Sequence, residues 1–270
     1  MTAYWAGKQR IGKDLSKVML QYIDLFAQCG ITFRGYWECF VGMGGVMRHM
    51  IGPLASQFPN MQFCGTDNNV AVTNFWSAIR SGWEPPSHIT PEQYQYLKDT
   101  REAKSALHAF VGYSCGFHSE YFKGCPPPER IALYLYRNHK NVRAIQPMMS
   151  LANYANRDFF AIAPYLPHGF IYYLDPPYKM SGKYDRGFMY QAGFDTDKFW
   201  RTATALAQHS LVFVSETEAP DDWVVVWEKT WNAVANEHNY QRVERLFMHQ
   251  SALRRARECM MMQQQQSQME

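Results

Sequence analysis

The sequence has 270 residues, of which 47% are hydrophobic and 19% are charged, and its formal net charge is +3. This composition is that of an ordinary globular chain and excludes a disordered or fibrous protein. The net charge is too small to indicate a polyanionic partner, so nucleic-acid binding has to be argued from a local patch. The length suits one α/β domain with a smaller insertion.

Signals for export, membrane insertion and metal binding are not evident in the sequence. The first seventeen residues lack the apolar core of a secretory signal, and no apolar run is long enough to span a bilayer. The cysteines form no CxxC pair and lie near no paired histidine, which speaks against a zinc site and a disulfide framework. We therefore expect a cytoplasmic protein with reduced thiols, no metal and no membrane partner.

Residues 4–13 surround two glycines with basic and aromatic side chains. A glycine- and lysine-containing loop that leads into a helix can hold an anion or a carboxylate. The apolar spacing after Asp14 predicts such a helix. A frayed basic terminus is the alternative interpretation.

Residues 33–50 predict a short strand ending near Glu38, a glycine-rich turn, and a helix starting near Val46. This arrangement lets a ligand approach the backbone at a helix N-terminus. The turn does not match GxGxxG and no Walker lysine follows Gly45, so neither a dinucleotide nor a triphosphate is expected. A tight turn without a ligand is the alternative.

Residues 61–67 predict a second strand that ends in Asp67. An acid at this position can accept hydrogen bonds from ribose hydroxyls. Asn68 and Asn69 are then expected to cap the next helix. A glycine turn combined with a strand-end acid indicates an adenosine-containing cofactor without pyrophosphate, and S-adenosylmethionine fits that description.

Residues 81–149 are predicted to be an inserted, mostly helical region, with a polar helix at about 91–110 and a boundary at the three prolines 126–128. After this boundary, basic residues alternate with aromatic ones. Charge for phosphates and rings for bases suit a nucleic-acid surface, whereas a solvated helix face is the alternative. The candidate DNA contacts are Lys123, Arg130, Arg137, Lys140 and Arg143.

Residues 151–157 are predicted to be helical and lead into Asp158 and Phe159. A carboxylate and a ring at this point can contact the amine and the face of a cofactor adenine. An ordinary loop is the alternative.

The apolar run 170–174 predicts a strand buried on both faces, which passes directly into Asp175, Pro176, Pro177 and Tyr178. The prolines end the hydrogen-bond ladder and hold Asp175 at the carboxyl end of the strand, where open α/β sheets bind ligands. A carboxylate and a proline carbonyl can accept both hydrogens of an exocyclic amine, and a tyrosine can stack on a base. A strand that merely ends in a Pro-Pro turn is the alternative.

The remaining segments predict a candidate lid at 179–193, a buried strand at 210–216 and two strands at 223–227 and 243–248. The last two are expected to form an antiparallel pair at one edge of the sheet. Residues 256–270 are low in complexity and predicted to be a disordered tail.

These segments, in this order, resemble the Dam-like adenine-specific DNA methyltransferases of phage and restriction-modification systems. The N-terminal aromatic-Gly-Lys segment, the Glu38-to-Gly45 turn, Asp67, the Asp158-Phe159 pair and the Asp-Pro-Pro-Tyr tetrad are similar to that family's motifs. The turn has Cys39 where the family often has proline, and the N-terminal motif has Ala6-Gly7-Lys8 where the family usually has two glycines. Lys8 and Lys13 therefore compete for one role.

The resemblance implies a Rossmann-like S-adenosylmethionine-dependent methyltransferase sheet formed by residues 1–80 and 150–255, with 81–149 as target-recognition region. It implies methyl transfer to the N6 amine of an adenine flipped out of double-stranded DNA, with a cognate restriction enzyme as a further possible partner. Asp175, Pro176, Pro177 and Tyr178 would be catalytic. The cofactor contacts would be Tyr4, Trp5, Lys8, Lys13, Glu38, Phe40, Gly42, Gly44, Gly45, Asp67, Asn68, Asp158, Phe159 and Asp175.

Two other functions remain open from the sequence. One is the same chemistry on adenine in RNA, and the other is a DNA-binding paralogue that has lost catalysis. A protein-glutamine methyltransferase is disfavoured, because those enzymes have Asn where Asp175 stands.

Overall fold

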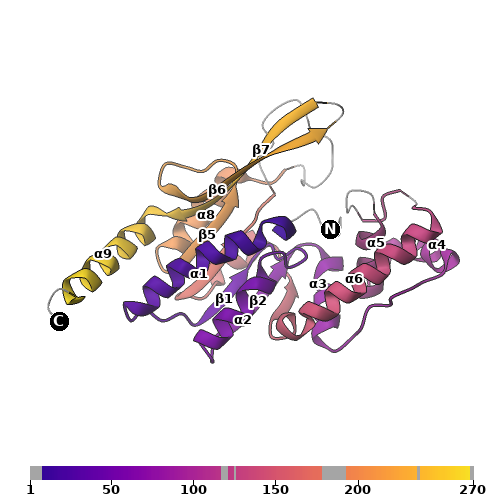
Figure 1. The fold of residues 1–270 in the computed structure, drawn as a ribbon, viewed down its shortest axis with the longest axis horizontal. Coiled ribbons are helices and arrows are strands. Elements are labelled where there is room, and N and C mark those ends of the chain that lie inside the picture. The colour runs from indigo at the N-terminus through magenta and orange to yellow at the C-terminus, as the bar shows by residue number, and fades with distance from the viewer. Residues whose placement is uncertain (1–7, 117–120, 125, 178–192, 236–237, 268–270) are drawn as a thin grey trace. The chain divides into compact units, whose positions relative to one another are not determined.

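The computed structural model describes residues 8–116, 121–124, 126–177, 193–235 and 238–267. Its strands are β1 (Gly35–Glu38), β2 (Gln62–Asp67), β3 (Asn153–Asn156), β4 (Phe170–Leu174), β5 (Leu211–Glu216), β6 (Trp223–Ala235) and β7 (His238–His249). They form a seven-stranded sheet in the order β3-β2-β1-β4-β5-β7-β6 (Figure 1). The pairs β2–β3, β1–β4 and β4–β5 are parallel, and β7 is antiparallel to β5 and β6. The 3-2-1-4-5 order is Rossmann-like, which confirms the predicted α/β fold class.

The chain divides into two compact units. The first unit comprises Met1–Lys13 and Phe40–Phe159, and the second comprises Asp14–Cys39 and Phe160–Glu270. The helices are α1 (Gly12–Gln28), α2 (Met47–Gln57), α3 (Val70–Arg80), α4 (Pro91–Asp99), α5 (Ala106–Cys115), α6 (Pro128–Met149), α7 (Phe159–Ile162), α8 (Thr196–Ala207) and α9 (Gln250–Ser267). None of these described helices is both long and apolar enough to cross a membrane.

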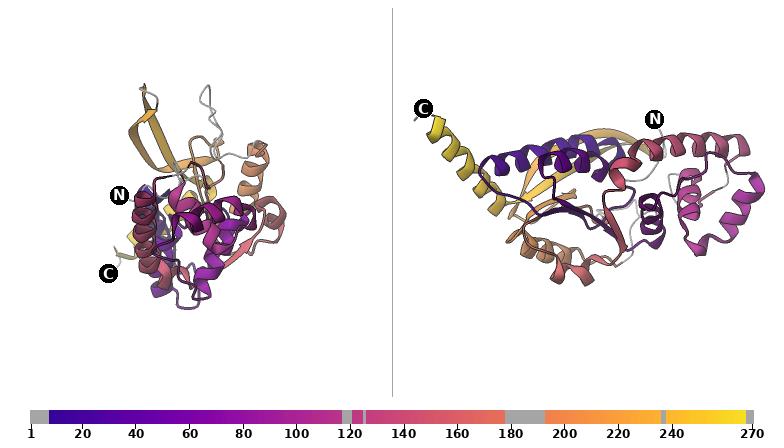
Figure 2. Two further views of the ribbon diagram at one scale, coloured as in Figure 1. Left: turned by 90° about the vertical axis from the view of Figure 1, so that its right-hand side faces the viewer. Right: turned by 90° about the horizontal axis from the view of Figure 1, so that it is seen from below.

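In the first unit, α3 packs against β3, α5 and α6, and α2 also contacts α6. The elements described between residues 91 and 149 are all helical and lie together (Figure 2). Thr90 and Gln93 form a capping box at the start of α4. The single helix predicted for 91–110 is instead divided into α4 and α5, because the chain turns at Lys104, whose φ is 49°. Ser105 then caps α5 by accepting from the backbone of His108.

In the second unit, every residue of β4 and β5 is buried, as the continuous apolar runs predict. The antiparallel pair predicted at the sheet edge is also confirmed, although β6 and β7 extend well beyond the predicted bounds. Helix α8 begins at a cap in which Asp195 accepts from the backbone of Lys198 at 2.8 Å. Asp175 directly follows the last residue of β4.

Two further local predictions are wrong. Residues 153–156 form strand β3 rather than a helix, because their backbone pairs with β2, from Cys64↔Asn153 to Asp67↔Asn156. The tail predicted to be disordered is helical as far as Ser267 in α9. Its Gln, Met and Arg residues are good helix formers, and Ala252, Ala256 and Cys259 give it a buried stripe.

Candidate functional site

The turn of residues 40–45, called here the glycine loop, is held by the acid at the end of β2. The two carboxylate oxygens of Asp67 accept from the backbone N–H of Gly42 and of Asn69, each at 2.9 Å. Gly42 has a φ of 45°, and no described atom lies within 4 Å of the position that a Cβ would occupy there. The position that a side chain at residue 42 would occupy is therefore open among the described residues. A carboxylate has about four acceptor positions, so Asp67 can bind ribose hydroxyls as well as the loop.

Gly44 and Gly45 have a different role, because they allow close packing. A Cβ on Gly44, whose φ is 63°, would lie 2.5 Å from Cε of Met149. A Cβ on Gly45 would lie 3.1 Å from backbone atoms of Lys8 and Gln9. Gly42 thus faces open space, whereas the next two glycines of the loop are packed against the protein.

The N-terminal segment holds the other side of the glycine loop. Gln9 donates to the carbonyl of Met43 at 3.1 Å, and a Cβ on Gly12 would lie 2.0 Å from the carbonyl oxygen of Gly45. Lys8 is buried, whereas Lys13 is exposed. The backbone of Lys8 lies against the loop, which makes Lys8 the better candidate of the two competing lysines.

Three residues that hold the loop were not identified from the sequence: Gln9, Gly12 and Trp76. The indole nitrogen of Trp76 donates to the carbonyl of Gly42 at 2.9 Å, and its ring stacks on Tyr154 with centroids 5.8 Å apart. Trp76 has the helical spacing of a core residue, which conceals its polar contact. The only sequence signal for Gly12 is its place in a glycine-containing segment that leads into a helix.

An aromatic pair extends the same region of the first unit. The rings of Phe40 and Phe159 have centroids 5.2 Å apart, and Phe159 is buried. Asp158 and Asn68 are exposed. The backbone carbonyl of Asp67 accepts from the Asn156 side chain at 2.9 Å, which ties the ends of β2 and β3 together. The structure therefore brings most of the described cofactor candidates around the end of β2.

In the second unit, Asp175 follows β4 and is half-buried, and Pro176 is buried. Beneath them, Tyr173 and Ser215 share a buried hydrogen bond of 2.8 Å. Glu38, at the end of β1, is paired in register with Tyr173 and accepts from the hydroxyl of Tyr36 at 2.6 Å. Asp175 thus follows a strand beside two buried, hydrogen-bonded pairs of side chains, Tyr173 with Ser215 and Tyr36 with Glu38.

The charge of Asp175 affects the pKa of two of these buried residues, Glu38 and Tyr173. Burial raises the pKa of Glu38 well above its usual range, the hydrogen bond from Tyr36 opposes the rise, and the nearby charge of Asp175 adds to it. Burial, followed by the charge of Asp175, also raises the pKa of Tyr173. Burial therefore favours the protonated form of Glu38. Glu38 is 1% exposed, and its role as a cofactor contact stays a prediction.

The basic residues predicted to contact DNA lie in or next to α6. Arg130, Arg137, Lys140 and Arg143 are exposed on this helix, and Lys123 is half-buried in the turn before it. The ammonium of Lys140 lies 4.8 Å above the ring of Tyr136, which is 50% exposed. This face of α6, called here the basic face, thus presents cations together with an accessible ring.

Some predicted features lie outside the described residues: Tyr4, Trp5, Tyr178 and nearly all of the candidate lid at 179–193. Among the residues that the structure does describe, no group of three or more His, Cys, Asp or Glu side chains could hold a metal ion.

No protein-family model and no curated protein matches this sequence. Among solved structures, the fold is similar to the crystal structure of TrmN from Thermus thermophilus, with 10% identity and a TM-score of 0.33. The alignment covers 84% of this chain and 47% of that one, so this chain spans about half the length of the matched structure.

Proposed function

We propose that the protein transfers a methyl group from S-adenosylmethionine to the N6 amine of adenine in double-stranded DNA. The observation that carries the proposal is the loop geometry at Asp67. An open, positive-φ glycine beside a strand-end carboxylate suits an adenosine ligand that approaches the backbone closely and offers ribose hydroxyls. The Asp-Pro-Pro-Tyr sequence after β4 supplies the second element.

The residues have distinct proposed roles on the cofactor side. Asp67 accepts from the ribose hydroxyls, and Lys8 with the glycine loop contacts the methionine end. Phe159 packs on the adenine ring, and Asp158 accepts from its amine. S-adenosylmethionine supplies an activated methyl group when bound.

On the substrate side, Asp175 and the carbonyl of Pro176 accept hydrogen bonds from the two N–H groups of the target amine. An adenine amine is a weak nucleophile because its lone pair is delocalised into the ring. Two acceptors favour its pyramidal form, and the Asp175 carboxylate stabilises the positive charge that develops on the nitrogen. Tyr178 stacks on the flipped base, and flipping costs a few kcal/mol of lost stacking.

The basic face of α6 supports DNA as the proposed substrate. Its exposed arginines and Lys140 offer charge to phosphates independently of sequence. The Tyr136 ring beside Lys140 adds a surface on which a base can stack.

The test is incubation of the protein with labelled cofactor and a mixture of unmethylated DNA and structured RNA, followed by mapping of modified adenines. Asp175→Ala is expected to lower transfer by at least about 100-fold while cofactor binding is partly retained. Asp158→Ala is the matched control, because it removes an exposed acid whose proposed contact is with the cofactor, and it should weaken cofactor binding instead.

Label found only in RNA would replace DNA by RNA as the substrate. DNA binding with neither measurable cofactor binding nor methyl transfer would support a paralogue that has lost catalysis. Normal turnover by Asp175→Ala would refute the assignment.

A further inference from the structure

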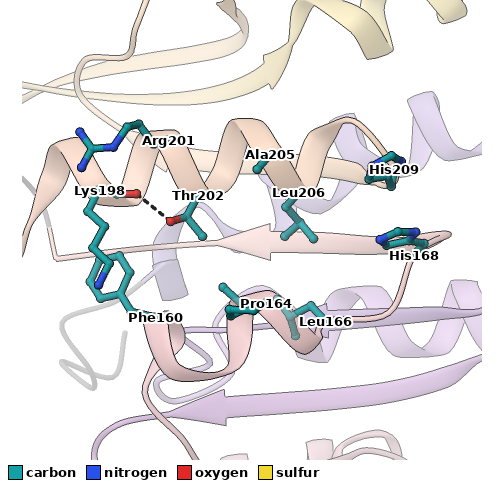
Figure 3. A pocket seen from close by; sticks show the side chains of 11 residues that line it. Phe160, Pro164, Leu166, His168, Lys198, Arg201, Thr202, Ala205, Leu206 and His209 are labelled. Carbon is teal, nitrogen blue, oxygen red and sulfur yellow. Dashed lines mark hydrogen bonds between the residues drawn. The ribbon is translucent and has the colours of Figure 1, made fainter.

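A cleft of about 410 Å³ lies in the second unit, between α8 and the segment 160–168 (Figure 3). Ala205 and Leu206 of α8 form one apolar wall, and Pro164 and Leu166 form the opposite one. None of the residues with a role in the proposed methyl transfer lines this cleft.

The described lining residues include basic side chains and no carboxylate. Lys198 and Arg201 lie toward the start of α8, and His168 and His209 lie at the other end of the cleft (Figure 3). Lys198 and Leu206 are about 12 Å apart along the helix, at a rise of about 1.5 Å per residue. The cleft therefore has a cationic end, an apolar middle and an imidazole end.

Contacts within the protein hold both ends in place. The ammonium of Lys198 lies 4.6 Å above the Phe160 ring, and the backbone carbonyl of Lys198 accepts from Thr202 at 2.8 Å. At the other end, the rings of His168 and His209 stack with centroids 4.4 Å apart. The carbonyl of His209 accepts from the backbone of Gly169 at 3.0 Å, so this pair is anchored through the main chain as well.

We propose that this cleft binds a small organic anion with an elongated apolar body. The acidic group pairs with Lys198, the body lies along Leu206, and its far end meets the histidine rings, while the Arg201 guanidinium is directed away from the segment 160–168 (Figure 3). The volume lies within the range of about 300–1,000 Å³ that is usual for small-molecule sites, and it far exceeds the room that a single inorganic anion needs. Apolar walls with a few charged groups that fix orientation are typical of such sites.

A matched pair of probes tests the charge requirement. Anilinonaphthalene sulfonate carries an anionic group on an aromatic body, and phenylnaphthylamine has the same rings without the charge. Fluorescence titration of the full-length protein should give at least about tenfold tighter binding of the sulfonate, since an ionic hydrogen bond is lost with the neutral probe. Equal affinity for the two probes would overturn the proposal.

A matched pair of variants tests the location. Ala205 is exposed and lies within α8, where Glu and Gln are both well accommodated. Ala205→Glu places a carboxylate in the cleft and should weaken sulfonate binding at least about tenfold relative to Ala205→Gln, which has nearly the same shape. Equal binding by these two variants would show that the probe binds elsewhere and would refute the assignment.

The cationic end has its own control. Lys198→Ala should weaken sulfonate binding about tenfold, whereas Arg254→Ala, which removes an exposed arginine of α9, should leave it unchanged. Equal effects would reduce the contribution of Lys198 to general charge and contradict the proposal. The fluorescence titrations contain neither S-adenosylmethionine nor nucleic acid, so their results are independent of the methyl-transfer assay.

Discussion

Replacing Gly12 with alanine tests the backbone contact between the N-terminal segment and the glycine loop. The new Cβ would lie 2.0 Å from the carbonyl oxygen of Gly45, whereas ordinary contact begins at 3.4 Å. The two backbones must therefore separate by about 1.4 Å, the difference between these distances. Overpacking of this kind costs ~1–3 kcal/mol in unfolding free energy. Since the glycine loop moves with Gly45, cofactor affinity should also fall, by roughly 5- to 150-fold if the whole cost falls on binding.

Gly52→Ala is the matched control for this experiment. Gly52 lies inside α2, and the nearest atom to its new Cβ is the sulfur of Met148 at 3.3 Å, at the flexible end of a side chain. Alanine in a helix interior is more stable than glycine by roughly 0.5–1 kcal/mol, so this variant should be neutral or stabilised. Urea unfolding and calorimetric titration with S-adenosylhomocysteine measure both quantities. If Gly12→Ala matched the wild type in both, the inferred backbone contact would be wrong.

Three further predictions concern the two units separately. Glu38 binds its proton more tightly in the folded state, because its pKa is raised there, so wild-type stability should fall as pH rises above the usual glutamate range. Glu38→Gln removes this dependence. The unfolding free energy of the variant, measured with urea, should therefore rise relative to that of the wild type by at most about 1.4 kcal/mol per pH unit. A difference between the two proteins that stays constant with pH would contradict this. Trp76→Phe loses the 2.9 Å hydrogen bond to Gly42 and should cost about 1 kcal/mol and weaken cofactor binding in the same titration, whereas unchanged affinity would remove Trp76 from the loop's support. Arg137→Ala should weaken DNA binding equally across sequences and reduce the salt slope by about 1, with Arg80→Ala of α3 unchanged; a sequence-specific loss would point to base contact instead.

The buried strands of the sheet could be predicted because their sequences allow one interpretation. The apolar run of β4 is only five residues long, which is too short for a typical helix. Pro176 and Pro177 follow it closely and end the hydrogen-bond ladder of a strand. Strand β3 could not be predicted, because Asn153–Asn156 has little apolar content and becomes a strand through its pairing with β2. Helix α9 lies where low complexity predicts disorder, and it forms because its residues favour helix.

The candidate site was predicted in part for a similar reason. Glu38 and Asp67 stand at strand ends, and strand ends are visible in the sequence. The difference between Gly42 and Gly45 is not visible there, because it depends on which distant residues pack against each one. Lys8 contacts the loop from the N-terminal segment, and Met149 does so from the end of α6. Such long-range contacts leave no local pattern.

The two-point attachment of Asp67 changes how its substitution should be interpreted. In Asp67→Asn, one oxygen becomes an NH₂ group, so one of the two backbone donors, Gly42 or Asn69, would face another donor in either side-chain orientation. Such a variant would distort the turn as well as lose a sugar contact. Weaker nucleoside binding by this variant would therefore combine two effects, a distorted backbone turn and a lost hydrogen-bond acceptor. Only a nucleoside that lacks the ribose hydroxyls could separate them.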